Sequence, residues 1–370
     1  MNAAQELHEL GQSLWLDNIT RKIVTDGTLR RYIDELAVTG LTSNPTIFQK
    51  AIGDTNFYDD AIRRKTQEGK ASEAMFFELA LEDLTQAADL FRPVHDRTNG
   101  VDGWVSLEVS PLLADRAEAT IQAALALHAR AARPNLFIKI PGTAAGLVAI
   151  EESIYQGVPI NVTLLFSREQ YLAASAAYMR GIERRLAAGL DPKVASVASI
   201  FVSRWDVAVK DKVAPQLQNR LGIAIAQRAY LAYHDVLASP RWRQLAAAGA
   251  QQQRLLWAST GTKDPAAPDT LYIEALAAPD TINTMPEKTL LAFAEHGQVK
   301  NPMTADVAAA GEWEGMLDKF VRSGINDMSL AEQLQREGAL AFDKSWKDLL
   351  AGISSKSEQL QGAAGMKVQS

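Results

Sequence analysis

The stretch that decides the fold reads LFIKIPGTAAGLVAIEESIYQGVPINVTLLF and covers residues 136–166. Short apolar runs stand at its two ends, and a longer segment containing Ala and Glu separates them. This alternation is typical of a strand, a crossover connection and a second, parallel strand. The pattern therefore predicts an α/β protein built on a parallel sheet.

The same alternation extends over most of the chain. Helical spacing of apolar residues predicts helices over 115–130, 167–186 and 214–237. Eight strands joined by crossovers fit a (β/α)8 TIM barrel, a fold that takes ~250 residues and tolerates insertions. An open, doubly wound sheet is the alternative, although no G-x-G-x-x-G opens a helix after the first strand. The expected strands are 13–19, 40–42, 105–110, 136–140, 160–166, 196–202, 255–258 and 281–285.

Residues beyond a minimal barrel gather in two places. Residues 51–93 are more than one crossover needs and predict a helical insertion, and residues 287–352 predict additional C-terminal helices. The Ser-, Gln- and Gly-rich residues 354–370 are expected to fray. Because the chain shows no internal repeat and no low-complexity linker, we expect a single barrel domain over residues 1–370.

Composition excludes several classes of function. The 370 residues are 47% hydrophobic and 22% charged, which is ordinary for a globular protein. The absence of cysteine excludes a disulfide scaffold, a thiolate zinc site and a cysteine nucleophile, and five scattered histidines leave little for a metal site. A net charge of −6 predicts neither nucleic-acid nor anionic-membrane binding. Without an apolar leader or a run of ~20 apolar residues, we expect a cytoplasmic protein.

Polar side chains interrupt several of the predicted strands. Buried parallel strands normally read as continuous apolar runs. Charged groups within them are expensive unless they are paired or face a polar pocket, and in a barrel that pocket is the mouth at the carboxyl ends of the strands. The interrupting residues are Asp17, Glu108, Lys139, Asn161 and Thr163.

Lys139 is the sharpest of these interruptions, because Ile138 and Ile140 flank it. Desolvation disfavours an ammonium group, so we expect the pKa of Lys139 to fall below ~10.4. A neutral amine can attack a carbonyl carbon and form a Schiff base. The structural alternative is a lysine that reaches to the rim of the barrel or pairs with Glu108.

Asp17 and Glu108 supply two carboxylates for proton transfer. Schiff-base aldol chemistry needs a base that takes a hydroxyl proton as the carbon–carbon bond breaks, and proton transfer when the carbinolamine loses water. The structural alternatives are that Asp17 caps the turn that follows it, and that Glu108 pairs with Lys139 or an arginine.

Amides and hydroxyls near the strand ends suit a polyhydroxylated ligand. Asn44 follows the second strand and offers both a donor and an acceptor, although it could equally cap the next helix. Asn161 and Thr163 could bind the same ligand or be ordinary strand residues.

Four residues at or beyond the sixth and seventh strands suit an anion. Barrels often bind phosphate on late loops, where arginine holds it with two hydrogen bonds and lysine acts as a point charge. The alternative for Arg204 is a salt bridge with Asp206 or with another nearby carboxylate. The four residues are Ser199, Arg204, Ser259 and Lys263.

At this point the chain resembles the transaldolase family, in its longer bacterial branch. The resemblance covers about residues 14–290 and, more weakly, the C-terminal helices. The motifs that carry it are LDNITR (16–21), GLTSNPTIF (40–48), VSLEVSP (105–111), NLFIKIPGT (135–143), GVPINVTLLFS (157–167), SVASIFVSRWD (196–206), LLWASTGTKDP (255–265) and DTINTMPEKTL (280–290).

The resemblance implies a (β/α)8 barrel of the class I aldolase type that uses neither metal nor organic cofactor. It also implies transfer of a dihydroxyacetone unit from sedoheptulose 7-phosphate to glyceraldehyde 3-phosphate, in the non-oxidative pentose phosphate pathway. Lys139 matches the Schiff-base lysine of the family and Asp17 its acid/base. The further matches are Glu108 and Thr163 to the pair that holds the catalytic water, Asn44, Asn161 and Ser199 to the ligands of the dihydroxyacetone hydroxyls, and Arg204 and Ser259 to phosphate ligands.

One position departs from the family pattern. Gly261 stands where the shorter branch has an arginine, and Lys263 is our candidate for the missing charge. Two alternatives stay open, namely an enzyme similar to fructose 6-phosphate aldolase that releases dihydroxyacetone, and a non-catalytic barrel that binds sugar phosphates. We expect phosphorylated sugars as partners, neither nucleic acid nor membrane, and leave open whether the chain forms a homo-oligomer.

Overall fold

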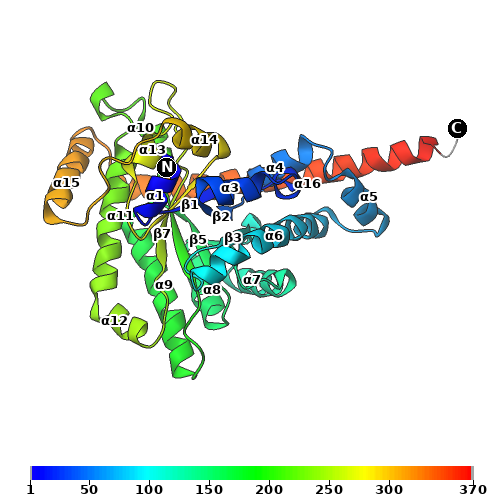
Figure 1. The fold of residues 1–370 in the computed structure, drawn as a ribbon, viewed down its shortest axis with the longest axis horizontal. Coiled ribbons are helices and arrows are strands. Elements are labelled where there is room, and N and C mark those ends of the chain that lie inside the picture. The colour runs from blue at the N-terminus through cyan, green and yellow to red at the C-terminus, as the bar shows by residue number, and fades with distance from the viewer. Residues whose placement is uncertain (1, 368–370) are drawn as a thin grey trace.

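The computed structural model describes residues 2–367 and has a closed barrel of eight parallel strands at its centre (Figure 1). The strands follow one another around the barrel in chain order, and the last pairs with the first. This closure confirms the (β/α)8 fold and excludes the open sheet. The strands are β1 (Ser13–Asp17), β2 (Val38–Thr42), β3 (Trp104–Glu108), β4 (Leu136–Pro141), β5 (Ile160–Leu165), β6 (Ser196–Phe201), β7 (Arg254–Ala258) and β8 (Ile282–Met285).

The strand boundaries differ slightly from the sequence prediction. β1 ends at Asp17 rather than at residue 19, and β4 continues through Pro141. The cause is pairing with the neighbouring strand, since Asp17 lies opposite Thr42 and Pro141 lies opposite Thr163. Register therefore brings the polar strand ends to one level at the mouth of the barrel.

Helices surround the barrel and extend one side of it. Those before and between the strands are α1 (Ala3–Glu9), α2 (Arg21–Thr25), α3 (Thr28–Leu36), α4 (Pro45–Gly53), α5 (Asp59–Gln67), α6 (Ser72–Arg97), η1 (Pro111–Leu113), α7 (Ala117–Ala131), α8 (Ala144–Tyr155), α9 (Arg168–Ala187), α10 (Ser203–Val209), η2 (Pro215–Leu217), α11 (Leu221–Ala238), α12 (Pro240–Ala247) and α13 (Leu271–Ala275). Those after β8 are α14 (Glu287–His296), α15 (Val307–Arg322) and α16 (Asp327–Lys367).

β4 shows how the strands divide their side chains between two surroundings. Successive residues of a strand face opposite sides of the sheet. Ile138 and Ile140 are buried in the large cluster that joins the strands to the helices, whereas Phe137 belongs to a second cluster with Trp15 and Trp104. Lys139 is two residues after Phe137, so its side chain lies on the same side of the strand. It therefore faces the barrel interior above this aromatic layer.

The C-terminal helix α16 is longer than the sequence prediction. It runs to Lys367 beside α4 and α5 in Figure 1, so residues 354–367, which were expected to fray, are helical, and residues 368–370 lie outside the described part. Contacts with the insertion explain the extra length. Trp346 packs against Phe76 with ring centroids 4.9 Å apart, and the Lys356 ammonium donates to the Ile52 carbonyl and lies 2.8 Å from Asp59 Oδ1.

Within residues 2–367, none of the helices combines the length and the apolar character that crossing a bilayer requires.

Gly40 gives a test of the close packing inside the barrel. A Cβ at this position would lie 2.7 Å from the Trp104 carbonyl oxygen and 2.7 Å from the indole ring of Trp15, which is fixed by donating to Asp102 Oδ1 at 2.8 Å. We expect Gly40→Ala to lower the free energy of unfolding by about 1–3 kcal/mol or more in urea denaturation, because overpacking forces neighbours to move.

Gly352 is the matched control, because it lies inside α16 with no atom near its Cβ position. Gly352→Ala should raise stability by up to ~1 kcal/mol through helix propensity. A Gly40→Ala protein as stable as the parent would contradict the packing argument.

Candidate active site

A cavity of about 120 Å³ lies at the carboxyl-terminal end of the barrel. The sequence prediction named ten site residues, and the structure brings all of them to this place. Eight line the cavity directly, and the other two, Glu108 and Asn161, contact lining residues. The eight are Asp17, Asn44, Lys139, Thr163, Ser199, Arg204, Ser259 and Lys263.

Lys139 is the central cation of the site. Its side chain is only 7% exposed, and its Nζ lies 3.2 Å from Glu108 Oε2. The same Nζ donates to the carbonyl of Ser43 at 3.2 Å, just after β2. Lys139 therefore both pairs with Glu108, as the structural alternative supposed, and lines the cavity, as the chemical interpretation requires.

Asp17 stands at the end of β1 and accepts a hydrogen bond from the Thr42 hydroxyl at 2.7 Å. The Thr42 and Thr284 hydroxyl oxygens are also 2.7 Å apart, so the hydroxyls of β2 and β8 form a short chain to the carboxylate. Burial raises the pKa of Asp17, and Lys139, the Thr42 hydroxyl and Lys263 act in the opposite direction. The capping alternative is wrong, because Thr20 caps α2 by accepting from the Ile23 amide.

Glu108 and Thr163 lie on either side of Lys139, on β3 and β5. Burial raises the pKa of Glu108, and the charge and hydrogen bond of Lys139 oppose that rise. The hydroxyl of Thr163 is buried and has no hydrogen-bond partner among the described residues. Buried hydroxyls are normally satisfied by protein or water, so Thr163 offers a free donor and acceptor next to the lysine.

Two amides belong to the site in different ways. Asn161 is fully buried, with its Oδ1 accepting from Ser199 at 2.7 Å and its Nδ2 donating to Ser106 at 3.1 Å. Asn44 lines the cavity while its Oδ1 accepts from the Ile47 amide at 3.0 Å, so the capping alternative is correct for this oxygen. Within residues 2–367, the amide nitrogen of Asn44 donates no hydrogen bond, so it can donate one to a ligand.

Arg204 forms the cationic side of the cavity. Its Cζ lies 5.1 Å from the Phe201 ring centroid and 5.9 Å from that of Phe342, and it makes no ion pair with any described residue. The structural alternative, a salt bridge between Arg204 and Asp206, is therefore wrong. Asp206 instead accepts from the backbone amide of Leu221 and from the Tyr272 hydroxyl, and burial raises its pKa to about 6.

Ser259 and Lys263 complete this side. Ser259 directly follows β7 and lies in the left-handed backbone region, with φ of 56°, and its hydroxyl oxygen lies 2.9 Å from that of Ser203. Such a conformation is uncommon for a residue other than glycine and concentrates at functional sites. Lys263 is exposed at the rim and borders the same cavity, beside Gly261. The arrangement suits a phosphate that enters from solvent.

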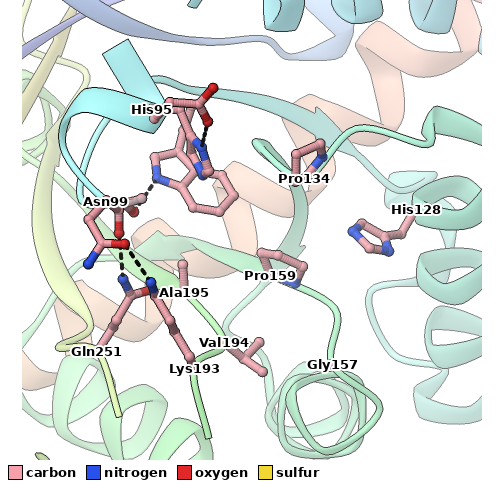
Figure 2. A pocket seen from close by; sticks show the side chains of 13 residues that line it. His95, Asn99, His128, Pro134, Gly157, Pro159, Lys193, Val194, Ala195 and Gln251 are labelled. Atoms are coloured by element: carbon pink, nitrogen blue, oxygen red, sulfur yellow. Dashed lines mark hydrogen bonds and ion pairs between the residues drawn. The ribbon is translucent and has the colours of Figure 1, made fainter. Parts of the chain in front are cut away.

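A larger cavity of about 470 Å³ lies at the opposite end of the barrel (Figure 2). Its residues include Pro134, Pro159 and Lys193, which precede β4, β5 and β6. Figure 2 shows that the Lys193 ammonium is already bound to the Asn99 side chain, at 2.8 Å. This cavity contains no lysine paired with a carboxylate, so chemistry rather than size selects the smaller cavity as the candidate active site.

Several residues of the site were missed in the sequence analysis, among them Thr42, Ser106, Thr284 and Phe342. The first three are polar residues in predicted strands, the same signal that found Lys139. Phe342 had no local signal, because it lies on α16, about 200 residues along the chain from Lys139. Among residues 2–367, no three His, Asp or Glu side chains are arranged to hold a metal ion.

Comparison with known proteins agrees with this geometry. The family model described as transaldolase/fructose-6-phosphate aldolase matches residues 14–353. A protein named transaldolase from Parafrankia sp. is 44% identical, over 97% of this chain and 98% of the relative. One from Saccharopolyspora erythraea is 42% identical over 96% and 98%, and transaldolase 2 of Streptomyces coelicolor is 41% identical over 98% and 100%. The chain therefore belongs to the transaldolase/fructose-6-phosphate aldolase family.

Proposed function

We propose that this protein is a transaldolase that moves a dihydroxyacetone unit from sedoheptulose 7-phosphate to glyceraldehyde 3-phosphate. The products are erythrose 4-phosphate and fructose 6-phosphate, and the reaction belongs to the non-oxidative pentose phosphate pathway. The observation that carries the proposal is an enclosed lysine, Lys139, that shares one cavity with Asp17 and contacts Glu108. The names of the relatives support transfer as the outcome.

Schiff-base formation begins at Lys139. Its amine attacks C2 of the donor ketose, and the resulting carbinolamine loses water to give an iminium ion. Glu108 lies close enough to exchange a proton with the lysine, and its raised pKa makes it a better base than an ordinary glutamate. The hydroxyl of Thr163 is placed to hold the departing or attacking water.

Asp17 then serves cleavage and transfer. Asp17 takes the proton of the C4 hydroxyl, and the C3–C4 bond breaks. The electrons of that bond form an enamine on Lys139, and the remainder of the donor leaves as an aldehyde. In the second half, C3 of the enamine attacks the carbonyl carbon of the acceptor and Asp17 returns its proton to the new hydroxyl. Hydrolysis of the iminium releases the product, so no oxidant or reductant is consumed.

The polar residues on the remaining strands bind the substrate in this scheme. Asn44 and Ser199 can hold hydroxyls of the dihydroxyacetone unit, and Asn161 fixes Ser199 from below. Arg204, Ser259 and Lys263 are placed to bind the phosphate of donor and acceptor.

The second candidate is an aldolase that releases free dihydroxyacetone, because the description of the matching family covers both reactions. It would use the same lysine and the same cleavage step. An assay for dihydroxyacetone in the absence of an acceptor separates the two, since a transaldolase retains the three-carbon unit until an aldehyde arrives.

Borohydride reduction in the presence of fructose 6-phosphate tests the nucleophile. We expect a reduced three-carbon adduct on Lys139, identified by peptide mass mapping. Lys139→Ala should form no adduct and lose about 10³-fold or more in kcat/KM, as enzymes do without their nucleophile. Lys193→Ala, at the other end of the barrel, is the matched control and should be trapped normally. An adduct on another lysine would overturn the assignment.

The pH dependence tests the role of Asp17. The Thr42 hydroxyl lowers the pKa of Asp17, so Thr42→Val should raise that pKa further. Because Asp17 must be ionised to take the C4 proton, the acidic limb of the kcat/KM profile should move to higher pH. Thr39→Val, which removes another buried hydroxyl from β2, should leave that limb in place. Equal profiles for both variants would argue against Asp17 as the base.

Lys263→Ala tests the rim cation. An exposed charge contributes ~1 kcal/mol, so KM for both phosphorylated substrates should rise about fivefold while kcat stays near its original value. The KM for unphosphorylated fructose should not change, and Lys212→Ala at an exposed turn is the control. Unchanged KM values for the phosphorylated substrates would exclude Lys263 as the replacement for the missing arginine.

A further inference from the structure

Helix α16 crosses the mouth of the barrel before it reaches the insertion. Three of its residues, Gln335, Gly338 and Phe342, are spaced so that they share one helix face, and each meets the mouth of the barrel. Leu340 lies on another face and is 68% exposed. The chain thus brings a distant helix face directly over the site.

Gln335 attaches this face to the strands. Its Nε2 donates to the carbonyl of Leu164 at 2.9 Å and to that of Gly142 at 3.2 Å. Leu164 has a left-handed φ of 58°, and the register between β5 and β6 shifts between Val162 and Leu165. The irregular strand end therefore supplies the acceptor that holds α16 in place.

Gly338 sets how closely the helix approaches. A Cβ at this position would lie 2.9 Å from Leu164 Cδ2 and 3.3 Å from Arg204 Nη1. A larger side chain at this position would have to displace the ends of the Leu164 and Arg204 side chains. Glycine at this position allows the backbone of α16 to lie close to the residues that line the cavity.

The position of α16 places the side chain of Phe342 in the cavity. Its ring centroid lies 5.8 Å from Lys139 Nζ and 5.9 Å from Arg204 Cζ, and the residue is 6% exposed while it lines the cavity. The ring forms an apolar roof over the lysine. The cavity beneath it has a volume of about 120 Å³.

We propose that Phe342 is a specificity-determining residue that limits access of water to the three-carbon enamine on Lys139, and so favours transfer over release. The inference rests on the proposed function. The enamine has two fates. Its C3 can attack an acceptor aldehyde, or it can take a proton; water then adds to C2, the C2–N bond breaks, and dihydroxyacetone leaves with the amine restored. Both routes end with hydrolysis of an iminium by one water. Only the second needs a proton and water to reach the three-carbon intermediate before an acceptor binds, so a roof that restricts water at this stage slows release.

The experiment measures the ratio of free dihydroxyacetone to transferred product, with fructose 6-phosphate as donor and erythrose 4-phosphate as acceptor. Phe342→Ala should raise this ratio on the order of tenfold. Phe342→Leu should restore most of the parent ratio, because it keeps an apolar side chain. Gln335→Ala should raise the ratio with Phe342 still present, by loosening the helix. Leu340→Ala is the matched control on the same helix and should behave like the parent.

The outcomes separate this inference from the proposed function. Circular dichroism and the Tm identify variants that fold, and if Phe342→Ala fails to fold, Phe342→Leu and Gln335→Ala decide. If the folded variants are trapped on Lys139 but their ratio of free dihydroxyacetone to transferred product is unchanged, the role of Phe342 is overturned. The proposed function then still stands. An equal rise in Leu340→Ala, or loss of the adduct in Phe342→Ala, also overturns the role of Phe342. A parent enzyme that forms no adduct on Lys139 overturns the proposed function and this inference together.

Discussion

The contact between Lys139 Nζ and the Glu108 carboxylate, 3.2 Å apart inside the barrel, is the interaction on which the rest of the site depends. Either charge alone in this enclosure would cost several kcal/mol, so each needs the other. They come from neighbouring strands and lie opposite one another in register. The Ser43 carbonyl that also accepts from Lys139 follows β2, which is not hydrogen-bonded to β4. The pair is therefore satisfied only when β2, β3 and β4 have assembled.

The same enclosure prepares the two carboxylates differently. Burial raises the pKa of both Asp17 and Glu108, which moves each towards the range where it can exchange a proton near neutral pH. Glu108 is held by the lysine itself, whereas Asp17 is held by the hydroxyl of Thr42. In the proposed mechanism, Glu108 therefore exchanges protons with the lysine nitrogen, and Asp17 stays available to a substrate hydroxyl.

Sequence reasoning reached the barrel because each strand and crossover has its own local pattern. It reached the site because polar residues are rare in buried strands, which is why Lys139 and Asn161 stood out. It was wrong where the outcome depends on three-dimensional neighbours. Asp206 follows Arg204 closely in the chain, yet it turns to the amino end of α11 and binds Leu221. Phe342 escaped notice because helical spacing predicts that a face is buried but not which partner covers it.

The two ends of α16 explain why the chain carries helices beyond the barrel. A helix of 41 residues is ~60 Å long, more than the mouth of a barrel can support. Trp346 and Lys356 bind the far half to the insertion, through Phe76 and through Asp59. The near half is held by Gln335 at the strand ends. Because the helix is continuous between these attachments, the insertion fixes the position of the helix over the lysine, and the additional helices become part of the architecture of the site.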